Sequence, residues 1–481
     1  VVRLGSENGT EFGNGLLRAA GVEGDELNLS GKLGGDRPTV LAVVCALLDS
    51  LRVLDLSSNA LGPKNGTVVA KVLEANGSLL EINLKNNNLG EEGWCAIFKA
   101  LQVNQANAIA KWDLDSQGIN PTIVKSLAAY VTSSSSLTEL ILCLNELGDE
   151  GAKQVGAVLA DNKSLTILSL HGNNIGQDGG TSIAQALKVN SSLTSLDLYN
   201  NSIGDTGGVA IARALRVNGS LTEINLIDNN LGGEGWCAIF EALRDNEYNK
   251  IVGWDLYGQR SNARVIESLA AYVAVSGSLT NLNLRSHNIG AEGGVLIAKA
   301  LTGSHSLTSL NLTCNNIGPK GGVAIAEALR VNRSLTTLVL WSNKLGQEGV
   351  VALAQALKTN GSLRSLNLRL NGIGVEGGKA VAEALRVNGS LTELDLYRNK
   401  IGDEGWCAIF GALCDNKNTK IVKWLLGGED INPKIALSLA AYVTVSSSLT
   451  SLELRMNNIG DAGGKAIAEA LRINRSLTNL E

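Results

Sequence analysis

The chain has 481 residues, with 41 basic and 46 acidic side chains and a formal net charge of −5. This balance gives no overall basic field, so nucleic acid and anionic membrane surfaces are not expected as main partners. No apolar run approaches the roughly 18 residues that a membrane-spanning helix needs.

The N-terminal segment, residues 1–23, is rich in glycine and only weakly patterned, and no function can be read from it. The chain begins with Val1 and shows no signal peptide, so we expect the native start to be missing. A degenerate first repeat follows in residues 24–50.

Residues 307–334 show the repeat unit in its clearest form. Leu307, Leu310 and Leu312 place alternating apolar side chains on one face of a short strand. Asn315 then ends the strand, and its amide can donate to and accept from backbone groups of the turn that would otherwise be buried without partners. The unit therefore begins with a strand and a turn held by asparagine.

The second half of this unit predicts a helix. Ile317 fills the turn, and Pro319 suits the first helical position. Gly321 and Gly322 let neighbouring backbones pass closely. The helix core is expected from apolar residues at helical spacing, namely Val323, Ile325, Ala326 and Leu329.

The same pattern begins again at residues 51, 79, 109, 137, 165, 193, 221, 251, 279, 307, 335, 363, 391, 421 and 449. The period is 28 residues, except in the units at 79, 221 and 391, which have 30. We therefore expect a single domain over residues 24–481, with sixteen repeats and a truncated seventeenth strand. Because no polar end cap is visible, we expect further repeats or another domain beyond Glu481.

Stacking such units predicts a curved α/β solenoid. Neighbouring strands lie about 4.8 Å apart, whereas packed helices need about 9 to 10 Å. The array must bend, which gives a horseshoe with a parallel β-sheet on its concave face and α-helices on its convex face.

The consensus LxxLxLxxNxIGxxGGxAIAxALxxNxS, repeated over residues 51–476, resembles the ribonuclease-inhibitor class of leucine-rich repeats. That class includes ribonuclease inhibitors, the sensor arms of nucleotide-binding-domain (NLR-type) immune receptors and the Ran GTPase-activating protein. The resemblance implies a horseshoe that binds macromolecules. It identifies no single partner, because function resides in sites and not in the fold.

Three units carry matched aromatic substitutions. The units at 79, 221 and 391 replace the second glycine and a small helix residue with Trp94 and Phe98, Trp236 and Phe240, and Trp406 and Phe410. Each following unit adds a Trp and a Tyr: Trp112 and Tyr130, Trp254 and Tyr272, and Trp424 and Tyr442. These residues either fill a core widened by the two extra residues or form an aromatic ridge that docks a partner.

No motif supports catalysis, a cofactor or a metal. The GGK runs at Gly378 and Gly464 are followed by Ala, unlike a phosphate-binding loop. His287 occupies the asparagine position of its repeat, and Gln117, Gln259 and Glu429 are similar substitutions that indicate local repacking. The chain is therefore predicted not to be an enzyme.

Two further residue types are explained by the repeat. We attribute the N-x-S/T sequences at Asn76, Asn218, Asn360 and Asn388 to an Asn-Gly-type turn that tolerates unusual φ values. The equivalent Cys95, Cys237 and Cys407 lie too many strands apart for disulfides, so we expect buried free thiols in the cytoplasm or another reducing intracellular compartment.

The concave face is where a partner can be predicted. The residue six positions after each opening leucine points away from the core. In the middle repeats this position is rich in aromatic residues and arginine, which often dominate binding energy at protein interfaces. Tyr and Trp also suit exposed strands, which is the competing explanation. The candidate contact residues are His171, Tyr199, Tyr257, Arg285, Trp341, Arg369, Tyr397, Arg398 and Arg455.

Charge along the outward-pointing strand positions is uneven. From residue 51 through the unit at 251, these positions hold nine acidic residues and only two basic ones, Lys85 and Lys111. From residue 279 onward, the same positions hold five basic residues, among them Arg285 and Arg369, and three acidic ones. This division predicts a protein partner with the complementary charges, whose basic part meets the N-terminal half.

We therefore predict a non-enzymatic scaffold or recognition module that binds a protein partner, within a larger assembly, through its concave face. The alternatives are a regulator, such as a Ran-type GTPase activator or an enzyme inhibitor, and the sensor arm of an NLR-type immune receptor. The oligomeric state cannot be read from the sequence.

Overall fold

The computed structural model describes residues 22–23, 25–32, 51–257, 259 and 262–481. It falls into two compact units, residues 1–242 and 243–481, which we describe separately. The predicted segment 1–23 lies outside the described residues except for its last two, and residues 33–50 of the first repeat lie outside them as well.

The first unit contains one nine-stranded sheet in chain order. Its strands are β1 (Val22–Glu23), β2 (Glu26–Asn28), β3 (Val53–Asp55), β4 (Glu81–Asn83), β5 (Lys111–Asp113), β6 (Glu139–Ile141), β7 (Ile167–Ser169), β8 (Ser195–Asp197) and β9 (Glu223–Asn225). Its described helices are α3 (Gly62–Leu73), α4 (Gly90–Val103), α5 (Pro121–Ser133), α6 (Gly148–Asp161), α7 (Gln177–Leu187), α8 (Gly204–Leu215) and α9 (Gly233–Asp245), whose last residues belong to the second unit.

The second unit repeats this arrangement in a second nine-stranded sheet. Its strands are β10 (Gly253–Asp255), β11 (Asn281–Asn283), β12 (Ser309–Asn311), β13 (Thr337–Val339), β14 (Ser365–Asn367), β15 (Glu393–Asp395), β16 (Lys423–Leu425), β17 (Ser451–Glu453) and β18 (Asn479–Leu480). Its helices are α10 (Ala263–Val275), α11 (Gly290–Gly303), α12 (Gly318–Val331), α13 (Gly346–Leu357), α14 (Gly374–Leu385), α15 (Gly402–Asp415), α16 (Pro433–Val445) and α17 (Gly460–Ile473).

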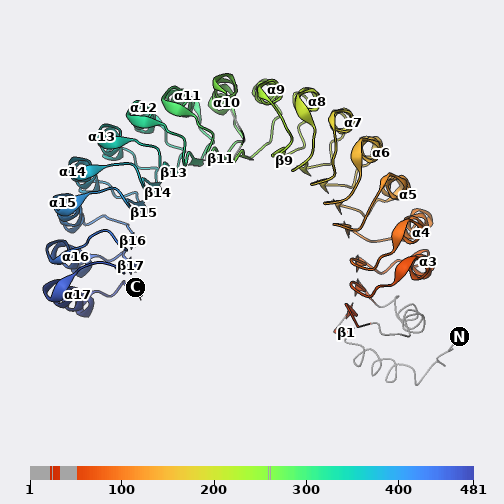
Figure 1. Ribbon diagram of the computed structural model, residues 1–481, viewed down its shortest axis with the longest axis horizontal. Helices are drawn as coiled ribbons and strands as arrows, with labels where there is room; N and C mark the ends of the chain where they lie inside the picture. Colours follow the sequence, from red (N-terminus) through yellow and green to blue (C-terminus); the bar gives the residue numbers. More distant parts are fainter. Residues whose placement is uncertain (1–21, 24, 33–50, 258, 260–261) are drawn as a thin grey trace. The chain divides into compact units, whose positions relative to one another are not determined.

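The strands pair in parallel with the leucines in register, as in Leu282 opposite Leu310 and Leu310 opposite Leu338. Within each unit the strands line the inner side of the curve and the helices lie outside them (Figure 1). The predicted α/β solenoid is thereby confirmed. The exception is β1, which pairs antiparallel with β2 at the sheet edge and was not predicted.

The core of each repeat lies between its strand and its helix. Leu310, Leu312, Ile317, Ile325 and Leu329 are all fully buried. A Cβ atom added to Gly321 would lie 2.3 Å from the side chain of Ile317. A Cβ atom added to Gly322 would lie 3.1 Å from the Cα atom of Gly349 in the next repeat. The second glycine therefore lets neighbouring backbones pass closely, as predicted, and the first lets the helix pack against its own turn.

The asparagine of each turn forms a ladder between repeats. Asn343 donates through Nδ2 to the carbonyl oxygens of Leu312 and Leu340 at 2.8 and 3.0 Å. Its Oδ1 accepts the N–H of Asn315 at 3.0 Å. This asparagine ladder satisfies buried backbone groups, which confirms the role predicted for Asn315.

A second row of asparagines corrects the explanation given for the N-x-S/T sequences. Asn360 and Gly361 do not have the positive φ values that we expected. Instead, the buried Asn360 side chain donates to the carbonyl oxygen of Leu329 at 2.8 Å and accepts the N–H of Leu363 at 2.9 Å. Asparagine is therefore required here for its amide hydrogen bonds and not for its backbone freedom.

The matched aromatic residues fill the core. Trp94 and Phe98 stack at 5.6 Å between ring centroids, Trp112 meets both rings edge-on, and Phe98 stacks on Tyr130 at 6.3 Å. The side chains of these four residues are at most 2% exposed. The corresponding rings in the second unit repeat this geometry. The alternative of an exposed docking ridge is therefore wrong, because the rings are buried against one another inside the core.

The cysteine prediction is correct in part. The six described cysteines are free. Cys237 is buried, but Cys95 and Cys407 are half-buried. Their sulfur atoms face carbonyl oxygens of the next repeat, those of Thr122 and Lys434. They lie at the joint between two helices and not in the core.

Of the helices that the structure describes, the longest have 14 residues, and none is long and apolar enough to cross a membrane.

Candidate partner-binding surface

The backbone of each repeat directs one side chain outward just after the strand. In ten of the fifteen repeats that begin at residues 51 to 449, an Asn or Asp four residues after the first residue accepts the N–H of the residue two positions later. The repeats of His171, Trp341 and Arg455 have Ser, Val and Glu at that position. Asn367 Oδ1 accepts the N–H of Arg369 at 3.0 Å, and Asp395 Oδ1 accepts that of Tyr397 at 2.9 Å. In the repeats that have it, this local turn fixes where the candidate contact residue begins.

Six of the nine predicted residues form one stack in the second unit, which we call the arginine–aromatic ladder: Tyr257, Arg285, Trp341, Arg369, Tyr397 and Arg398. The Cζ atom of Arg285 lies 5.3 Å from the ring centroid of Tyr257 and 5.8 Å from that of Trp341. Arg369 lies 5.1 Å from Trp341 and 4.3 Å from Tyr397. Arg398 lies 5.3 Å from Tyr397. Each guanidinium is thus placed over an aromatic face.

Thr313 allows the ladder to cross a repeat that has no aromatic residue or arginine at this position. Its hydroxyl donates to Asn311 Oδ1 at 2.7 Å, so the short side chain stays close to the sheet. Thr313 is only 2% exposed. Arg285 and Trp341 can therefore meet although a repeat lies between them.

The ladder arginines carry charge without a local counterion. Among the described residues, no carboxylate lies within ion-pair distance of Arg285, Arg369 or Arg398. Arg455 differs, because its Nε lies 2.5 Å from Glu453 Oε1. The ladder therefore presents positive charge that the described part of the chain leaves available.

Arg455, the seventh predicted residue of this unit, lies across a hollow from the end of the ladder. This arginine hollow has a volume of about 450 Å³. It is lined by Arg369, Tyr397, Arg398, Leu425, Gly427, Gly428, Glu453, Arg455 and Met456. Gly427 and Met456 were not among the residues predicted from the sequence. The available signal was Gly427 itself, the only glycine among the outward residues at this repeat position.

His171 and Tyr199 belong to the first unit and form a pair of their own. Their ring centroids lie 4.7 Å apart in an edge-to-face contact. A hydrogen bond to the carboxylate of Asp228 raises the pKa of the Tyr199 hydroxyl, since it stabilises the protonated form. No arginine takes part in this pair.

The two lysines on the inner face of the first unit are neutralised by acidic neighbours. Lys85 Nζ lies 2.6 Å from Asp113 Oδ2, and Lys111 Nζ lies 2.8 Å from Glu139 Oε1. The hydrogen bond that Lys111 donates to Glu139 raises the pKa of Lys111. The remaining carboxylates leave this face acidic, which is the charge difference that the sequence indicated.

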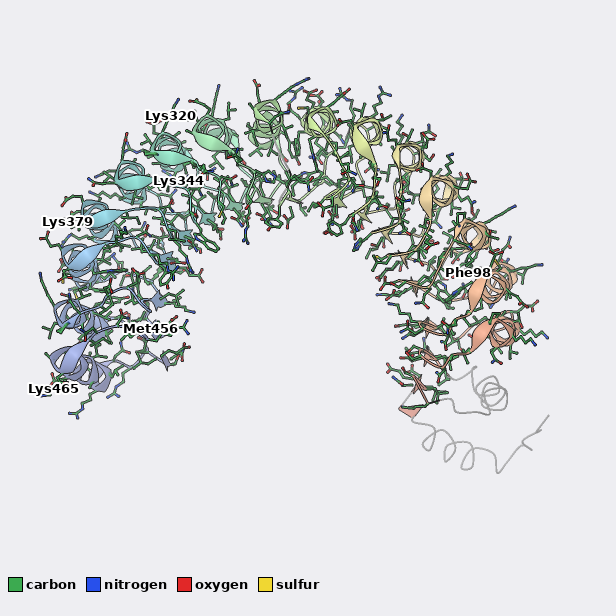
Figure 2. All side chains as sticks on the ribbon, in the orientation of Figure 1. Phe98, Lys320, Lys344, Lys379, Met456 and Lys465 are labelled. Atoms are coloured by element: carbon green, nitrogen blue, oxygen red, sulfur yellow. The ribbon has the colours of Figure 1, made fainter. Side chains whose placement is uncertain are left out.

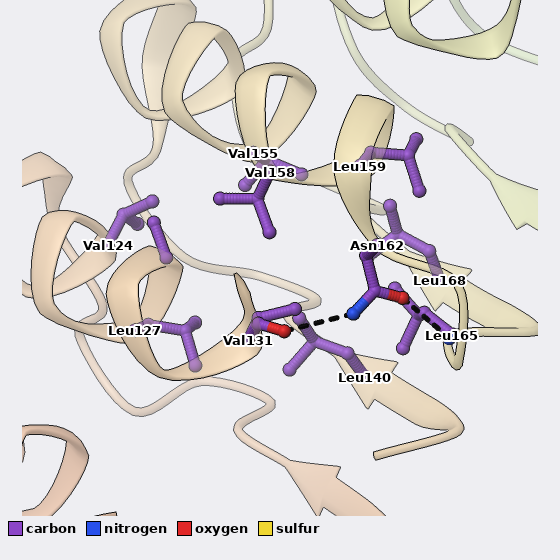
Figure 3. A pocket seen from close by; sticks show the side chains of 11 residues that line it. Val124, Leu127, Val131, Leu140, Val155, Val158, Leu159, Asn162, Leu165 and Leu168 are labelled. Atoms are coloured by element: carbon purple, nitrogen blue, oxygen red, sulfur yellow. Dashed lines mark hydrogen bonds between the residues drawn. The ribbon is translucent and has the colours of Figure 1, made fainter. Parts of the chain in front are cut away.

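Other hollows have different linings. One of about 550 Å³ includes Arg398, Lys400, Asp403, Glu429 and Asp430, and one of about 310 Å³ includes Lys358, Arg364 and Lys420. An apolar cavity between α5 and α6 has a volume of about 20 Å³ and is lined by residues such as Val131, Val155 and Leu159 (Figure 3). It has room for about one water-sized group. Within the residues that the structure describes, no three His, Cys, Asp or Glu side chains gather as metal ligands.

Comparisons with known proteins agree with this architecture. The leucine-rich-repeat family matches residues 49–64, 133–156, 161–184, 189–212, 276–298, 303–326, 331–354, 359–382, 387–409 and 445–468. No curated protein sequence matches the chain.

Many solved structures match the chain, among them the following two. A leucine-rich-repeat protein of Leptospira interrogans has 19% sequence identity and a TM-score of 0.53, with 98% of each chain covered. The actin-binding site 2 of leiomodin-1 has 21% identity and a TM-score of 0.27, covering 31% of this chain and 86% of that one. The first similarity extends over the full repeat array and supports the fold alone. The ten matched segments and the repeated strand-helix units together show that the chain contains leucine-rich repeats.

Proposed function

We propose that the chain is a protein-recognition module that binds a macromolecular partner through the inner faces of its sheets. The arginine–aromatic ladder carries this proposal. Arg, Tyr and Trp side chains combine large contact areas with polar or charged groups, which is why they dominate many interfaces.

The stacking also prepares the ladder for binding. A free arginine loses rotamer entropy when an interface immobilises it, at roughly 0.5–1.5 kcal/mol per side chain. Arg369 is already held over Trp341 and Tyr397. Its ordering on binding therefore costs less, and more of the contact energy contributes to affinity.

The charge on the ladder supports an acidic contact region on the partner. Arg285, Arg369 and Arg398 have no described carboxylate partner, so a partner's carboxylates or phosphates would be their first strong ligands. The first unit, with its acidic inner face, suits a basic region of the same partner.

Affinity capture followed by mass spectrometry tests the proposal. The bait would be the whole chain, compared with the double variant Arg285→Glu/Arg369→Glu and with Lys299→Glu/Lys465→Glu. The control lysines lie on α11 and α17, and Figure 2 shows Lys465 on the helical side. Proteins that bind the ladder should be retained by the wild type and the control and lost from the inner-face variant.

A purified candidate should then bind the wild type directly, and the inner-face variant should associate about tenfold more slowly at low salt. Equal association with the wild type and the inner-face variant would contradict the proposed surface.

We further infer a ribonuclease-inhibitor-type repeat and a reducing cellular compartment. The 28-residue period with one α-helix per repeat supports the subclass, and the free thiols of the described cysteines support the compartment. An enzyme inhibitor, a GTPase activator, a sensor arm and a subunit of a larger assembly differ in which protein is bound. The identity of the captured partner therefore decides among them.

A further inference from the structure

We propose that the arginine hollow receives one phosphorylated side chain of the partner protein. This inference rests on the proposed function and names the chemical group recognised at one end of the ladder. It is carried by the shape of the hollow, its unbalanced charge and the way its arginines are held.

A missing side chain creates the hollow. Gly427 occupies the outward position that Tyr397 and Arg455 fill in the neighbouring repeats. A Cβ atom at Gly427 would lie 2.5 Å from Glu453 Oε1 and 3.2 Å from Arg455 Cγ. Gly427 does not have positive φ, so its backbone does not require glycine. Glycine provides room here for the paired side chains of Glu453 and Arg455, which form the wall of the hollow.

The charges around this space do not cancel. Three guanidinium groups, those of Arg369, Arg398 and Arg455, face the single carboxylate of Glu453. Glu453 already pairs with Arg455. Among the lining residues, two positive charges remain, and Glu429 behind Arg398 offsets one of them only in part. A phosphate dianion balances this remaining charge better than a single carboxylate does.

The two remaining arginines are held by the same ring. Arg369 and Arg398 lie 4.3 and 5.3 Å from the Tyr397 centroid. Arg369 Nε is buried without a hydrogen-bond partner in the described structure, so a ligand is contacted through its terminal nitrogens. Behind Arg398, Glu429 Oε1 accepts its backbone N–H at 2.6 Å and fixes the turn. Paired guanidinium groups at a fixed spacing suit the several acceptor oxygens of a phosphate.

The walls suit an aromatic carrier for that phosphate. Leu425, Met456 and the ring of Tyr397 line the hollow beside the arginines. Met456 is 88% exposed, and a methionine side chain adapts readily to aromatic surfaces. With about 450 Å³ available, phosphotyrosine fits the combination of charge and apolar wall better than phosphoserine.

Isothermal titration with short Gly–Ala peptides tests this inference on the whole chain. The peptides would share one sequence and carry phosphotyrosine, phosphoserine, glutamate or unmodified tyrosine at the centre. We expect the phosphotyrosine peptide to bind at least about tenfold more tightly than the glutamate and tyrosine peptides. Inorganic phosphate should compete, and affinity should fall below about pH 6 as the phosphate loses one charge.

Three variants locate the site. Arg398→Gln and Gly427→Leu should each lower phosphopeptide affinity about tenfold, the first by removing charge and the second by filling the hollow. Lys400→Gln, an exposed change of equal charge two residues from Arg398, should have no effect. Circular dichroism would confirm that each variant is folded.

Equal binding of the four peptides, or unchanged phosphopeptide binding by Gly427→Leu, would overturn the inference. These results would leave the proposed function standing if the captured partner still depends on Arg285 and Arg369. Conversely, a partner that binds the Arg285→Glu/Arg369→Glu variant as well as the wild type would refute the proposed function of the arginine–aromatic ladder. The peptide result would be unaffected.

Discussion

The inner faces of the two units differ although their repeats are built alike. In the first unit, Lys85 and Lys111 are paired with carboxylates, and the face is acidic. In the second unit, three arginines stack on aromatic rings and lack carboxylate partners among the described residues. The repeat consensus therefore sets the scaffold, and a few outward positions set the chemistry. Perturbing scaffold and face separately tests this division.

The largest effect is expected in the shared scaffold. Phe98→Ala in the first unit and Phe410→Ala in the second should each lower the local free energy of unfolding by about 3–5 kcal/mol, because each leaves a cavity in an equivalent aromatic core. Hydrogen exchange measured by mass spectrometry should show the loss in the repeats around the substitution.

The exposed Val445, on α16, provides the control, and Val445→Ala should change protection little. If one phenylalanine proved dispensable and the other did not, the two scaffolds would not be equivalent and the comparison would fail.

The next effect belongs to the second unit alone. His287 stands in the asparagine ladder, and burial lowers its pKa from 6.5 to about 4. The unfolded chain therefore binds a proton more readily than the folded chain between these values. The free energy of unfolding is therefore highest, as far as His287 is concerned, above about pH 6.5. It decreases by on the order of 3 kcal/mol as the pH falls to about 4.

His287→Asn should remove this acid sensitivity and restore the usual amide donor to the ladder. Urea unfolding followed through hydrogen exchange of residues 279–317, at neutral and at acidic pH, would measure it. His305→Asn, at an exposed position, should retain the wild-type pH dependence. An identical acid response in His287→Asn and the wild type would show that the depressed pKa of His287 does not control stability.

A smaller effect is expected on association with the partner. Lys85→Gln/Lys111→Gln frees Asp113 and Glu139 from their ion pairs and makes the first face more acidic. A partner with a basic region should then bind this variant a few times faster at low salt, whereas Arg285→Gln/Arg369→Gln should slow binding. Stopped-flow association at two salt concentrations would measure both rates. Parallel changes in the two variants would contradict the idea of opposite charges on the two faces.

The sequence predicted the scaffold better than the site, for a physical reason. Alternating leucines and the turn asparagine act through backbone spacing, so their positions follow from the period alone. The contact of Arg285 with Trp341 depends instead on side-chain rotamers and on Thr313 lying flat between them. The arginine hollow depends on an absent side chain at Gly427, which no apolar pattern reveals. A residue type can thus indicate a surface before it indicates the geometry of that surface.

The smallest effect concerns a position of the asparagine ladder at which the two units have different residues. Gln117 Oε1 accepts the N–H of Asn86 at 2.9 Å, and Glu429 Oε1 accepts that of Arg398 at 2.6 Å. Burial raises the pKa of Glu429, and Arg398 only partly offsets this. The folded chain then binds the proton more readily, so ionised Glu429 lowers stability at neutral pH, and this penalty disappears as the pH falls towards the ordinary value of 4.5.

Glu429→Gln should therefore stabilise the second unit at neutral pH by about 1 kcal/mol and have less effect in acid. The reciprocal Gln117→Glu should lower the stability of the first unit by more than Glu429→Gln raises that of the second. The reason is that Asn86, at the position equivalent to Arg398, supplies no positive charge. Hydrogen exchange of the two repeats at neutral and acidic pH would compare them. Equal and opposite changes would mean that Arg398 gives Glu429 no electrostatic support, and its charge would then be fully available to a ligand in the arginine hollow.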